Sequence, residues 1–353
     1  FYTVRDAAKR PHALWRWRVG GAPEPVLEEA DATFRLSLGK TKDGRYLALY
    51  SASFETSELR VLCAESSDRA PGEPWQLVRA REPGVRVEAL EHREGRFYLL
   101  TNKDAHNYRL ASVGVHALSA PWQDVVPARE GVRLEALELF EDHLCLAERE
   151  HGLRRLSVLH LGSGARHPVA LPDEIGTFAF GHFRDPQGHA GLSANPEPGA
   201  PCLRLSYSSL VRPHAVYDLE LATLHLKLLG AREVPGYDPE DYEAERFYAH
   251  AQDGTEVPVS LVYHRGLRAR GPAPCLLYGY GSYGVSLEPS FAPERLSLLE
   301  RGLIYAIAHV RGGGEMGRSW YEAGKFLNKR NTFEDFVACA EALVGEGYTG
   351  SDR

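Results

Sequence analysis

A coarse repeat that fills roughly the first two thirds of the chain constrains the fold more than any other feature. Five stretches each combine a short strand-like run, a polar turn and a returning run in which apolar residues alternate with polar ones. Successive stretches begin 44, 51, 47 and 59 residues apart, at Phe1, Arg45, Arg96, His143 and Cys202. This spacing is typical of one four-stranded propeller blade per repeat. The repeats share a pattern and little identity, so a β-sandwich or a series of unrelated hairpins also remains open.

A change of pattern follows the repeats. The segment 233–247, "EVPGYDPEDYEAERF", is rich in proline and acidic residues, as linkers between domains often are. The length of 353 residues also exceeds the size at which a single core keeps growing. We therefore predict propeller blades over residues 1–235 and a second domain over residues 236–353.

The second domain is predicted to alternate strands and helices. Asp253 and Gly254 mark the turn of a hairpin. We expect that hairpin over 246–265, a strand over 273–280, a helix over 295–302 that ends at a glycine, a buried strand over 303–310, and a helix that begins at Thr332 with a capping box. Strands joined through helices favour a parallel α/β sheet with crossover connections.

Composition excludes several classes of function. The net charge is −7 and the basic residues are scattered, which argues against a nucleic-acid partner. The longest apolar run, 303–310, is far shorter than the roughly 20 residues of a membrane-spanning helix. Five widely spaced cysteines are typical of reduced thiols rather than a disulfide framework, so a cytoplasmic location is predicted.

Both ends of the sequence indicate a piece of a longer protein. The first residue is Phe1, inside a strand-like run, and the single methionine is Met316. The last residues, "GYTGSDR", stand where another strand of an α/β sheet is expected. We therefore expect this chain to be a piece of a longer protein, with the rest of the second domain following it.

Two glycine-rich loops could carry chemistry. "RGGGEMG" (311–317) matches the dinucleotide-binding pattern at Gly312, Gly314 and Gly317. That function is disfavoured because 318–331 separates the last glycine from the capped helix, whereas the pattern needs a helix that opens directly on it. We interpret the glycines as a tight loop that could still line a site, because ligands bind at the carboxyl ends of α/β strands.

The other loop, "YGYGSYG" (278–284), ends the preceding strand, so both loops are expected at the same sheet edge. A tyrosine hydroxyl held there could donate a hydrogen bond to a developing oxyanion. A packed aromatic corner is the structural alternative.

The sequence contains no complete catalytic or metal-binding signature. G-x-S-x-G, the nucleophile pattern of α/β hydrolases, is absent from the 353 residues, and Ser282 does not fit it. The fifteen histidines show no H-E-x-x-H or similar metal spacing, so no metal or other cofactor is predicted. His309 is interpreted as a buried core histidine and Asp253 as a turn former.

The second domain resembles the prolyl oligopeptidase family of serine peptidases, and within it the oligopeptidase B group. The resemblance rests on "LLYGYGSYG", on "RLSLLERGLIYAIAHVRGGGEMGRSWYEAGKFLNKRNTFEDF" and on "GTEVPVSLVYHR". "EVPGY", "LSYSSL" and "NKDAHNYRL" extend it more loosely over the propeller half. It implies a seven-bladed β-propeller, here incomplete, followed by the first part of an α/β-hydrolase domain.

The resemblance also implies roles for individual residues. Tyr280 matches the tyrosine that completes the oxyanion hole, and Tyr283 matches a position that lines the substrate cleft. Glu288 matches the first of two acids near the subsite for a second basic side chain, and Ser290 replaces the second acid. The catalytic Ser, Asp and His would lie beyond Arg353, so that the segment alone is expected to be inactive.

The implied activity is hydrolysis of short peptides after Arg or Lys, with the propeller limiting access to the active site. Short basic peptides are therefore the expected partners, and the oligomeric state stays open. Three alternatives remain: a propeller interaction protein with a degenerate hydrolase domain, a prolyl- or acylaminoacyl-specific relative, and a nucleotide-binding protein that uses "GGGEMG".

Overall fold

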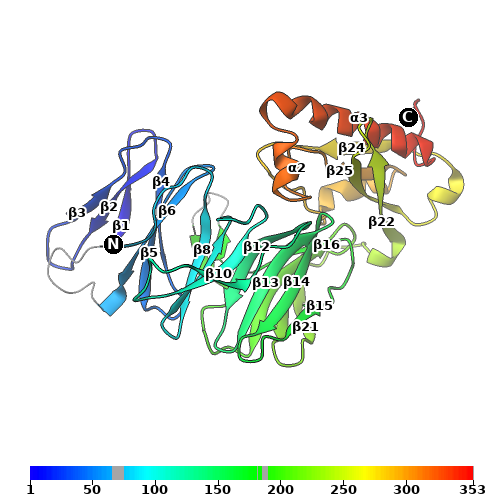
Figure 1. Cartoon of the computed structure of the whole chain (residues 1–353). Helices are drawn as coiled ribbons and strands as arrows, with labels where there is room; N and C mark the ends of the chain where they lie inside the picture. Colours follow the sequence, from blue (N-terminus) through cyan, green and yellow to red (C-terminus); the bar gives the residue numbers. More distant parts are fainter. Residues whose placement is uncertain (66–74, 181, 185–189, 353) are drawn as a thin grey trace. The chain divides into compact units, whose positions relative to one another are not determined.

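The computed structural model describes residues 1–65, 75–180, 182–184 and 190–352. The chain forms two compact units, one of residues 1–128 with 139–141, the other of residues 129–138 with 142–353. Figure 1 shows the strands of the first unit from blue to cyan, and the sheets and helices of the second unit from green to red.

The first unit consists of three antiparallel sheets, one for each of the first three predicted repeats. The first sheet has three strands and the other two have four. In sequence order the strands are β1 (Tyr2–Arg5), β2 (Pro11–Arg16) and β3 (Glu24–Glu28); β4 (Arg35–Lys40), β5 (Tyr46–Ala52), β6 (Ser57–Cys63) and β7 (Gln76–Arg79); β8 (Val87–Arg93), β9 (Arg96–Thr101), β10 (Arg109–Gly114) and β11 (Gln123–Val126).

Apolar side chains join neighbouring sheets within this unit. Leu59 and Val61 on β6 pack in one cluster with Leu90, Phe97 and other residues of the third sheet. Burial of such side chains stabilises each by about 1.5–3 kcal/mol relative to exposure. The alternating apolar residues from which the repeats were recognised therefore form the core between sheets.

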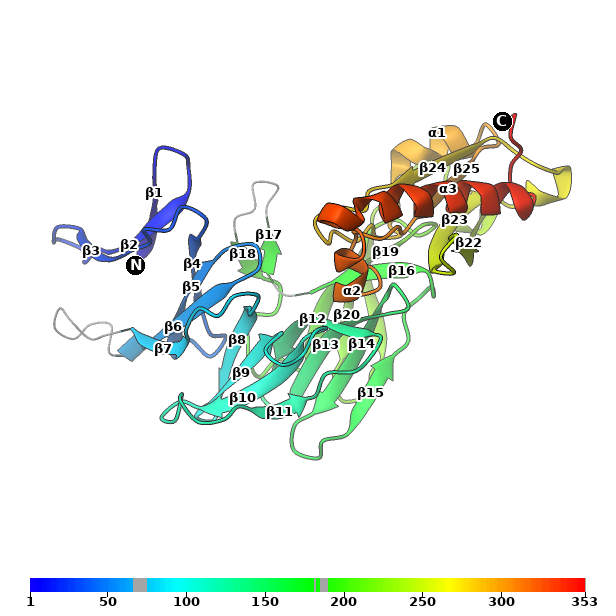
Figure 2. The ribbon, with the colours of Figure 1, turned by 45° about the horizontal axis from the view of Figure 1, so that its top comes forward.

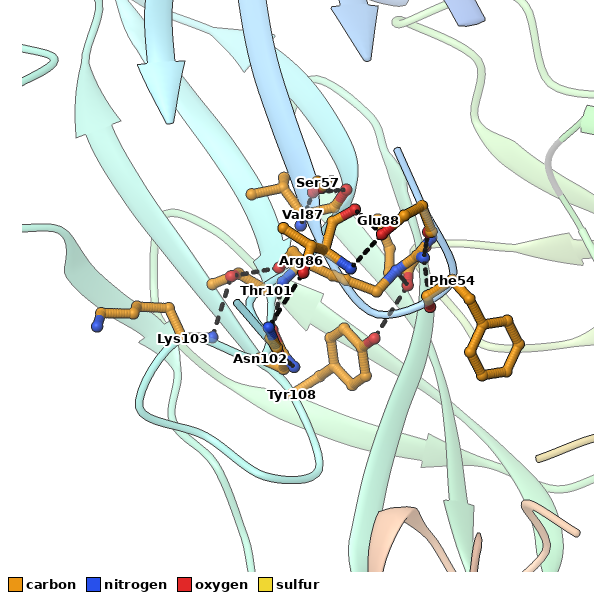
Figure 3. A network of polar contacts seen from close by, with 12 residues as sticks. Phe54, Ser57, Arg86, Val87, Glu88, Thr101, Asn102, Lys103 and Tyr108 are labelled. Atoms are coloured by element: carbon orange, nitrogen blue, oxygen red, sulfur yellow. Dashed lines mark hydrogen bonds and ion pairs between the residues drawn. The ribbon is translucent and has the colours of Figure 1, made fainter. Parts of the chain in front are cut away.

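Polar contacts fix the same junction (Figure 3). The Ser57 hydroxyl oxygen accepts a hydrogen bond of 2.7 Å from the Val87 amide. The Thr101 hydroxyl donates to the Arg86 carbonyl at 2.7 Å, and the Arg86 guanidinium donates to Glu88 at 2.6 Å. Side chains from strands of two sheets thus bond the backbone amide and carbonyl groups where β8 begins, which fixes the position of one sheet against the other.

The second unit contains the fourth and fifth sheets. The fifth sheet pairs in the order β16-β19-β20-β21, and a two-stranded hairpin, β17 with β18, lies between β16 and β19 in the sequence. The strands are β12 (Val132–Leu139), β13 (His143–Glu150), β14 (Leu153–His160) and β15 (Arg166–Val169); β16 (Gly176–Ala179), β17 (His182–Arg184), β18 (Ala190–Ser193), β19 (Cys202–Ser209), β20 (Ala215–Glu220) and β21 (Leu226–Ala231). One sheet per repeat confirms the predicted blade pattern.

A mixed sheet follows in the order β22-β23-β25-β24. The hairpin β22–β23 joins β25 in antiparallel fashion, and only β24 and β25 pair in parallel. The elements are β22 (Tyr242–His250), β23 (Glu256–His264), β24 (Cys275–Gly279), α1 (Leu296–Leu299), β25 (Ile304–Ala308), α2 (Arg318–Glu322) and α3 (Lys329–Gly345). Four short 3₁₀ turns lie at Pro239–Asp241, Arg268–Arg270, Pro293–Arg295 and Phe326–Asn328. The predicted crossover from 273–280 through 295–302 to 303–310 is confirmed.

The sheet is covered on both faces. Helix α3 runs along one face in Figure 2, and Leu343 of this helix packs with Val259, Ala306 and neighbouring residues. Leu299 of α1 packs against Tyr305 and Ile307 on the opposite face. Every residue of β25 is therefore buried, as the uninterrupted apolar run predicted.

The expected start of α3 is wrong. The helix begins at Lys329 rather than Thr332, and no side chain caps it. The Thr332 hydroxyl instead donates to the Arg311 carbonyl at 2.7 Å, and the Asp335 carboxylate accepts from the Arg311 amide at 2.9 Å. The residues that matched a capping box form tertiary contacts with Arg311 in the loop after β25, which local sequence alone does not reveal.

The predicted domain boundary at residue 235 falls between β21, which ends at Ala231, and β22, which begins at Tyr242. The two compact units divide elsewhere, close to residue 128, so that two blades belong to the same unit as the mixed sheet. The boundary itself stays a prediction.

Candidate active site

Two glycine-rich loops meet at one edge of the mixed sheet. Segment 278–284 begins with the last two residues of β24, segment 311–317 follows β25, and these strands are parallel neighbours. The Gly284 amide donates to the Gly312 carbonyl at 3.0 Å. A β-carbon at Gly312 would overlap with the Gly281 carbonyl, and one at Gly314 would overlap with the Gly284 carbonyl. The glycines therefore allow backbone to pack on backbone, and the predicted convergence of the loops is confirmed.

This packing also explains the formal dinucleotide pattern. A short helix, α2, does begin directly after Gly317, so our argument that no helix opens there is wrong. The space beside Gly312 and Gly314 is nevertheless filled by the 278–284 loop rather than left open for a pyrophosphate. The pattern arises here from contact between two loops.

Tyr280 lies one residue beyond the end of β24, and 44% of it is exposed. Gly281 follows with a φ of 61°, a conformation that favours glycine. Lys329, the first residue of α3, donates to the Gly281 carbonyl and at 2.8 Å to the Ser282 hydroxyl. The loop thus has a fixed backbone from which the exposed Tyr280 side chain extends, and its role as an oxyanion donor stays a prediction.

Tyr283 is the most exposed residue of this loop, at 71%. Its φ is 56°, which costs an L-residue roughly 1–2 kcal/mol. The Val285 amide donates to the Ser282 carbonyl at 3.1 Å and closes the turn. An exposed aromatic ring held by a strained turn suits a substrate contact, although its predicted role stays a prediction.

Glu288 does not lie free at the site. Its carboxylate, with 24% of the side chain exposed, forms an ion pair with Arg149 of β13, whose side chain is only 1% exposed. Arg149 also donates to Glu135 of β12 at 2.7 Å, and Arg154 of β14 donates to Glu135 at 2.9 Å. Two guanidinium groups thus balance two carboxylates. A cationic side chain of a substrate would have to compete with Arg149 for Glu288.

The charges in this cluster shift the pKa of Glu135. Burial alone would raise it, but the neighbouring Arg149 and Arg154 outweigh burial and lower the pKa to about 2. Glu135 is therefore ionised at neutral pH. This cluster could not be predicted from the sequence. Its only local signal was a Glu and an Arg within strand-like repeats, and Glu288 lies more than a hundred residues away from Arg149 in the chain.

Arg311, at the start of the second loop, is also held by acids. Its guanidinium donates to the fully buried Asp335 at 2.6 Å and to Asp253 at 2.5 Å. The hydrogen bond from Arg311, together with bonds from Thr255, lowers the pKa of Asp253 to about 2. The Asp253 carboxylate accepts a hydrogen bond of 3.0 Å from the Thr255 amide, which confirms the prediction that Asp253 forms the turn. It also holds the Arg311 guanidinium in place.

His309 is buried, as predicted, and accompanies two other buried polar side chains. The Ser260 hydroxyl lies 2.9 Å from His309 Nε2, and Glu315 Oε1 lies 3.8 Å from His309 Nδ1. Within the described ranges, no group of three or more His, Cys, Asp or Glu side chains is arranged to hold a metal ion. The described helices also include none that is long and apolar enough to cross a membrane.

Successive four-stranded antiparallel sheets, joined to an α/β sheet with tyrosine- and glycine-bearing loops at its strand ends, define a β-propeller followed by the start of an α/β-hydrolase domain. Comparison with family models refines this class. Residues 1–232 match the prolyl oligopeptidase N-terminal beta-propeller domain, and residues 289–353 match the prolyl oligopeptidase family. The chain belongs to the prolyl oligopeptidase family.

Comparison with individual relatives supports this assignment to the family. The chain is 38% identical to Protease 2 of Moraxella lacunata over 357 residues, which cover all of this chain and 49% of the relative. It is also 38% identical to dipeptidyl aminopeptidase BI of Pseudoxanthomonas mexicana, covering 47% of that protein. Oligopeptidase B from Trypanosoma brucei, in a closed form with covalently bound antipain, superposes with a TM-score of 0.88 at 35% identity over 99% of this chain and 49% of that one. The chain thus spans about half the length of the relatives it matches.

Proposed function

We propose that this chain is part of a serine peptidase that hydrolyses short peptides on the carboxyl side of Arg or Lys. The similarity to a protein named Protease 2 and to an oligopeptidase B supports this proposal. The observation that carries it is Tyr280, whose exposed side chain extends from a loop that is fixed by glycine contacts and by Lys329.

In the proposed reaction a serine hydroxyl attacks the scissile carbonyl carbon while a histidine accepts its proton. The π electrons of the carbonyl move to oxygen, and the Tyr280 hydroxyl donates a hydrogen bond to that oxyanion. Collapse of the intermediate expels the amine, which takes the proton from histidine, and water then hydrolyses the acyl-enzyme ester. We place the nucleophile outside these 353 residues because they contain no G-x-S-x-G sequence.

We further propose that one basic residue in the substrate suffices. Glu288 is paired with Arg149, and Ser290 occupies the position of the second acid. An additional Arg or Lys of the substrate would gain little at a carboxylate whose charge is already balanced. The net charge of −7 still favours the approach of basic peptides, and the propeller would admit only short, unfolded chains.

The test is a set of fluorogenic peptides incubated with the full-length protein. We expect the highest kcat/KM after a single Arg or Lys, with less than about tenfold improvement for paired basic residues. Preference for Pro would favour a prolyl-specific relative. Release of dipeptides only from unblocked N-termini would favour the activity named for the Pseudoxanthomonas relative. No cleavage of any peptide would favour a propeller interaction protein.

We also propose that the protein acts in the cytoplasm. None of the five cysteines, all of which lie in the described part of the chain, forms a disulfide bond, and Cys145 and Cys339 are buried. Burial raises the pKa of the Cys339 thiol to about 12, so that it stays protonated and unreactive. Fractionation of cells followed by detection of the protein with an antibody tests this location; recovery outside the cytoplasmic fraction would contradict it.

A further inference from the structure

The Glu315 side chain is buried and reaches from one glycine-rich loop to the other. Only 2% of Glu315 is exposed. Its Oε1 accepts a hydrogen bond of 2.8 Å from the backbone amide of Leu287, the residue before Glu288. A single carboxylate thus links segment 311–317 to the far end of the loop that carries Tyr280 and Tyr283.

On its other side the Glu315 carboxylate lies next to His309, which in turn contacts Ser260 on the sheet. Glu315 Oε1 lies 3.8 Å from His309 Nδ1, and the opposite ring nitrogen lies 2.9 Å from the Ser260 hydroxyl on β23. Ser260 is fully buried and His309 is 2% exposed, so that this row of three side chains lies inside the protein.

Glu315 is also incompletely satisfied. Glu315 Oε2 and His309 Nδ1 are both buried without a hydrogen-bond partner among the described residues. A buried carboxylate oxygen that lacks a partner costs free energy, so the retention of Glu315 at this place is unexplained by stability alone. Natural proteins tolerate such costs mainly at sites where the group has a function.

Gly313 provides room for this arrangement. A β-carbon at position 313 would overlap with Glu315 Oε2, because the carboxylate folds back over the glycine. Gly313 does not have a positive φ, so an alanine there is compatible with the backbone. The middle glycine of "GGGE", Gly313, is therefore explained by the carboxylate, whereas Gly312 and Gly314 are explained by backbone contacts with the other loop.

We propose that Glu315 is a positioning residue for segment 280–288. It holds the Leu287 amide from the 311–317 loop, with His309 and Ser260 as its support, and so fixes the loop that places Tyr280, Tyr283 and Glu288. Its effect on catalysis rests on the proposed peptidase function. Its effect on the loop does not, and the two can be measured separately.

Hydrogen exchange of the full-length protein measures how firmly the backbone of segment 280–288 is held. Glu315→Ala removes the acceptor, and Gly313→Ala displaces the carboxylate without removing it. We expect faster amide exchange in segment 280–288 for both variants, with Leu287 affected most. Glu315→Gln keeps an acceptor for Leu287 and should exchange nearly as the unchanged protein does. Glu334→Ala, which removes a half-buried carboxylate paired with the exposed Arg330 on α3, is the matched control.

Peptide hydrolysis measures the consequence for catalysis. Small displacements of catalytic groups cost up to about 10²-fold in rate, and we expect kcat/KM to fall about ten- to a hundredfold for Glu315→Ala, with Glu315→Gln retaining most activity. In the Tyr280→Phe background the same change should lower kcat much less, because the displaced hydroxyl is already absent.

Unchanged exchange in both Glu315→Ala and Gly313→Ala would overturn the proposal. Faster exchange with unchanged kcat and KM would overturn the positioning role as well. If the full-length protein cleaves no peptide, the proposed function fails, and the exchange data still decide whether Glu315 holds the loop. If Glu315→Ala does not fold, Gly313→Ala provides the same comparison.

Discussion

The carboxylate of Glu135 is expected to contribute strongly to stability, and its replacement gives a worked test. Glu135→Gln removes a negative charge that two guanidinium groups, Arg149 and Arg154, contact at 2.7 and 2.9 Å. Only 12% of the Glu135 side chain is exposed. Its pKa falls from 4.5 to about 2, which corresponds to about 3 kcal/mol of stabilisation at neutral pH.

The pH dependence follows from the direction of this shift. A carboxyl whose pKa is lower in the folded state stabilises the fold above its unfolded pKa, and the contribution disappears as protons bind. The difference between the two proteins should therefore be about 3 kcal/mol at pH 7, begin to shrink near pH 5 and be nearly lost at about pH 2. Urea unfolding at a series of pH values measures it.

A surface pair in the same unit provides the control. Glu174 lies 3.7 Å from Arg155 and is 80% exposed, so Glu174→Gln should change the free energy of unfolding by less than about 1 kcal/mol at any pH. A Glu135→Gln effect below 1 kcal/mol at pH 7, or one that does not depend on pH, would refute the assignment of the cluster as a stabilising network.

Three further predictions concern the site. Tyr280→Phe should lower kcat about 10²-fold with little change in KM, as loss of one oxyanion donor does; steady-state kinetics with kcat within twofold would exclude the role. Asp335→Ala leaves the buried Arg311 guanidinium short of its main partner and should cost about 3–5 kcal/mol in urea unfolding; a cost below 1 kcal/mol would mean that the pair is not stabilising. Gly281→Ala should destabilise the protein, because its β-carbon would overlap with the side chains of Thr332 and Val310 and its φ is positive, whereas Gly345→Ala, in open space within α3, should stabilise it by about 0.5–1 kcal/mol; equal melting temperatures would contradict this.

Structural elements that give a periodic sequence pattern could be predicted from the sequence. The spacing of the strand pairs predicted the blades, and the uninterrupted run at 303–310 predicted the buried strand β25, because burial on both faces removes alternation. The turn at Asp253 and Gly254 was readable as well, since its geometry is local.

Contacts between distant segments were not readable. Thr332 and Asp335 matched a capping box because the residue types are the same, yet both bind Arg311 in the loop after β25. The resemblance to the family indicated Glu288 as a substrate contact, but nothing local revealed that Arg149 of a propeller strand is its partner. The "GGGE" glycines resembled a nucleotide loop until the backbone of the neighbouring loop was seen to fill the space.

The central claim is that Tyr280 donates to the oxyanion of a peptide being cleaved after Arg or Lys. A crystal structure of the full-length protein with a peptide that ends in an arginine aldehyde tests it most directly, because the hemiacetal oxygen imitates the oxyanion. The account predicts that this oxygen lies about 2.7–3.1 Å from the Tyr280 hydroxyl. A hemiacetal oxygen bound by other donors, with the Tyr280 side chain turned away, would contradict it.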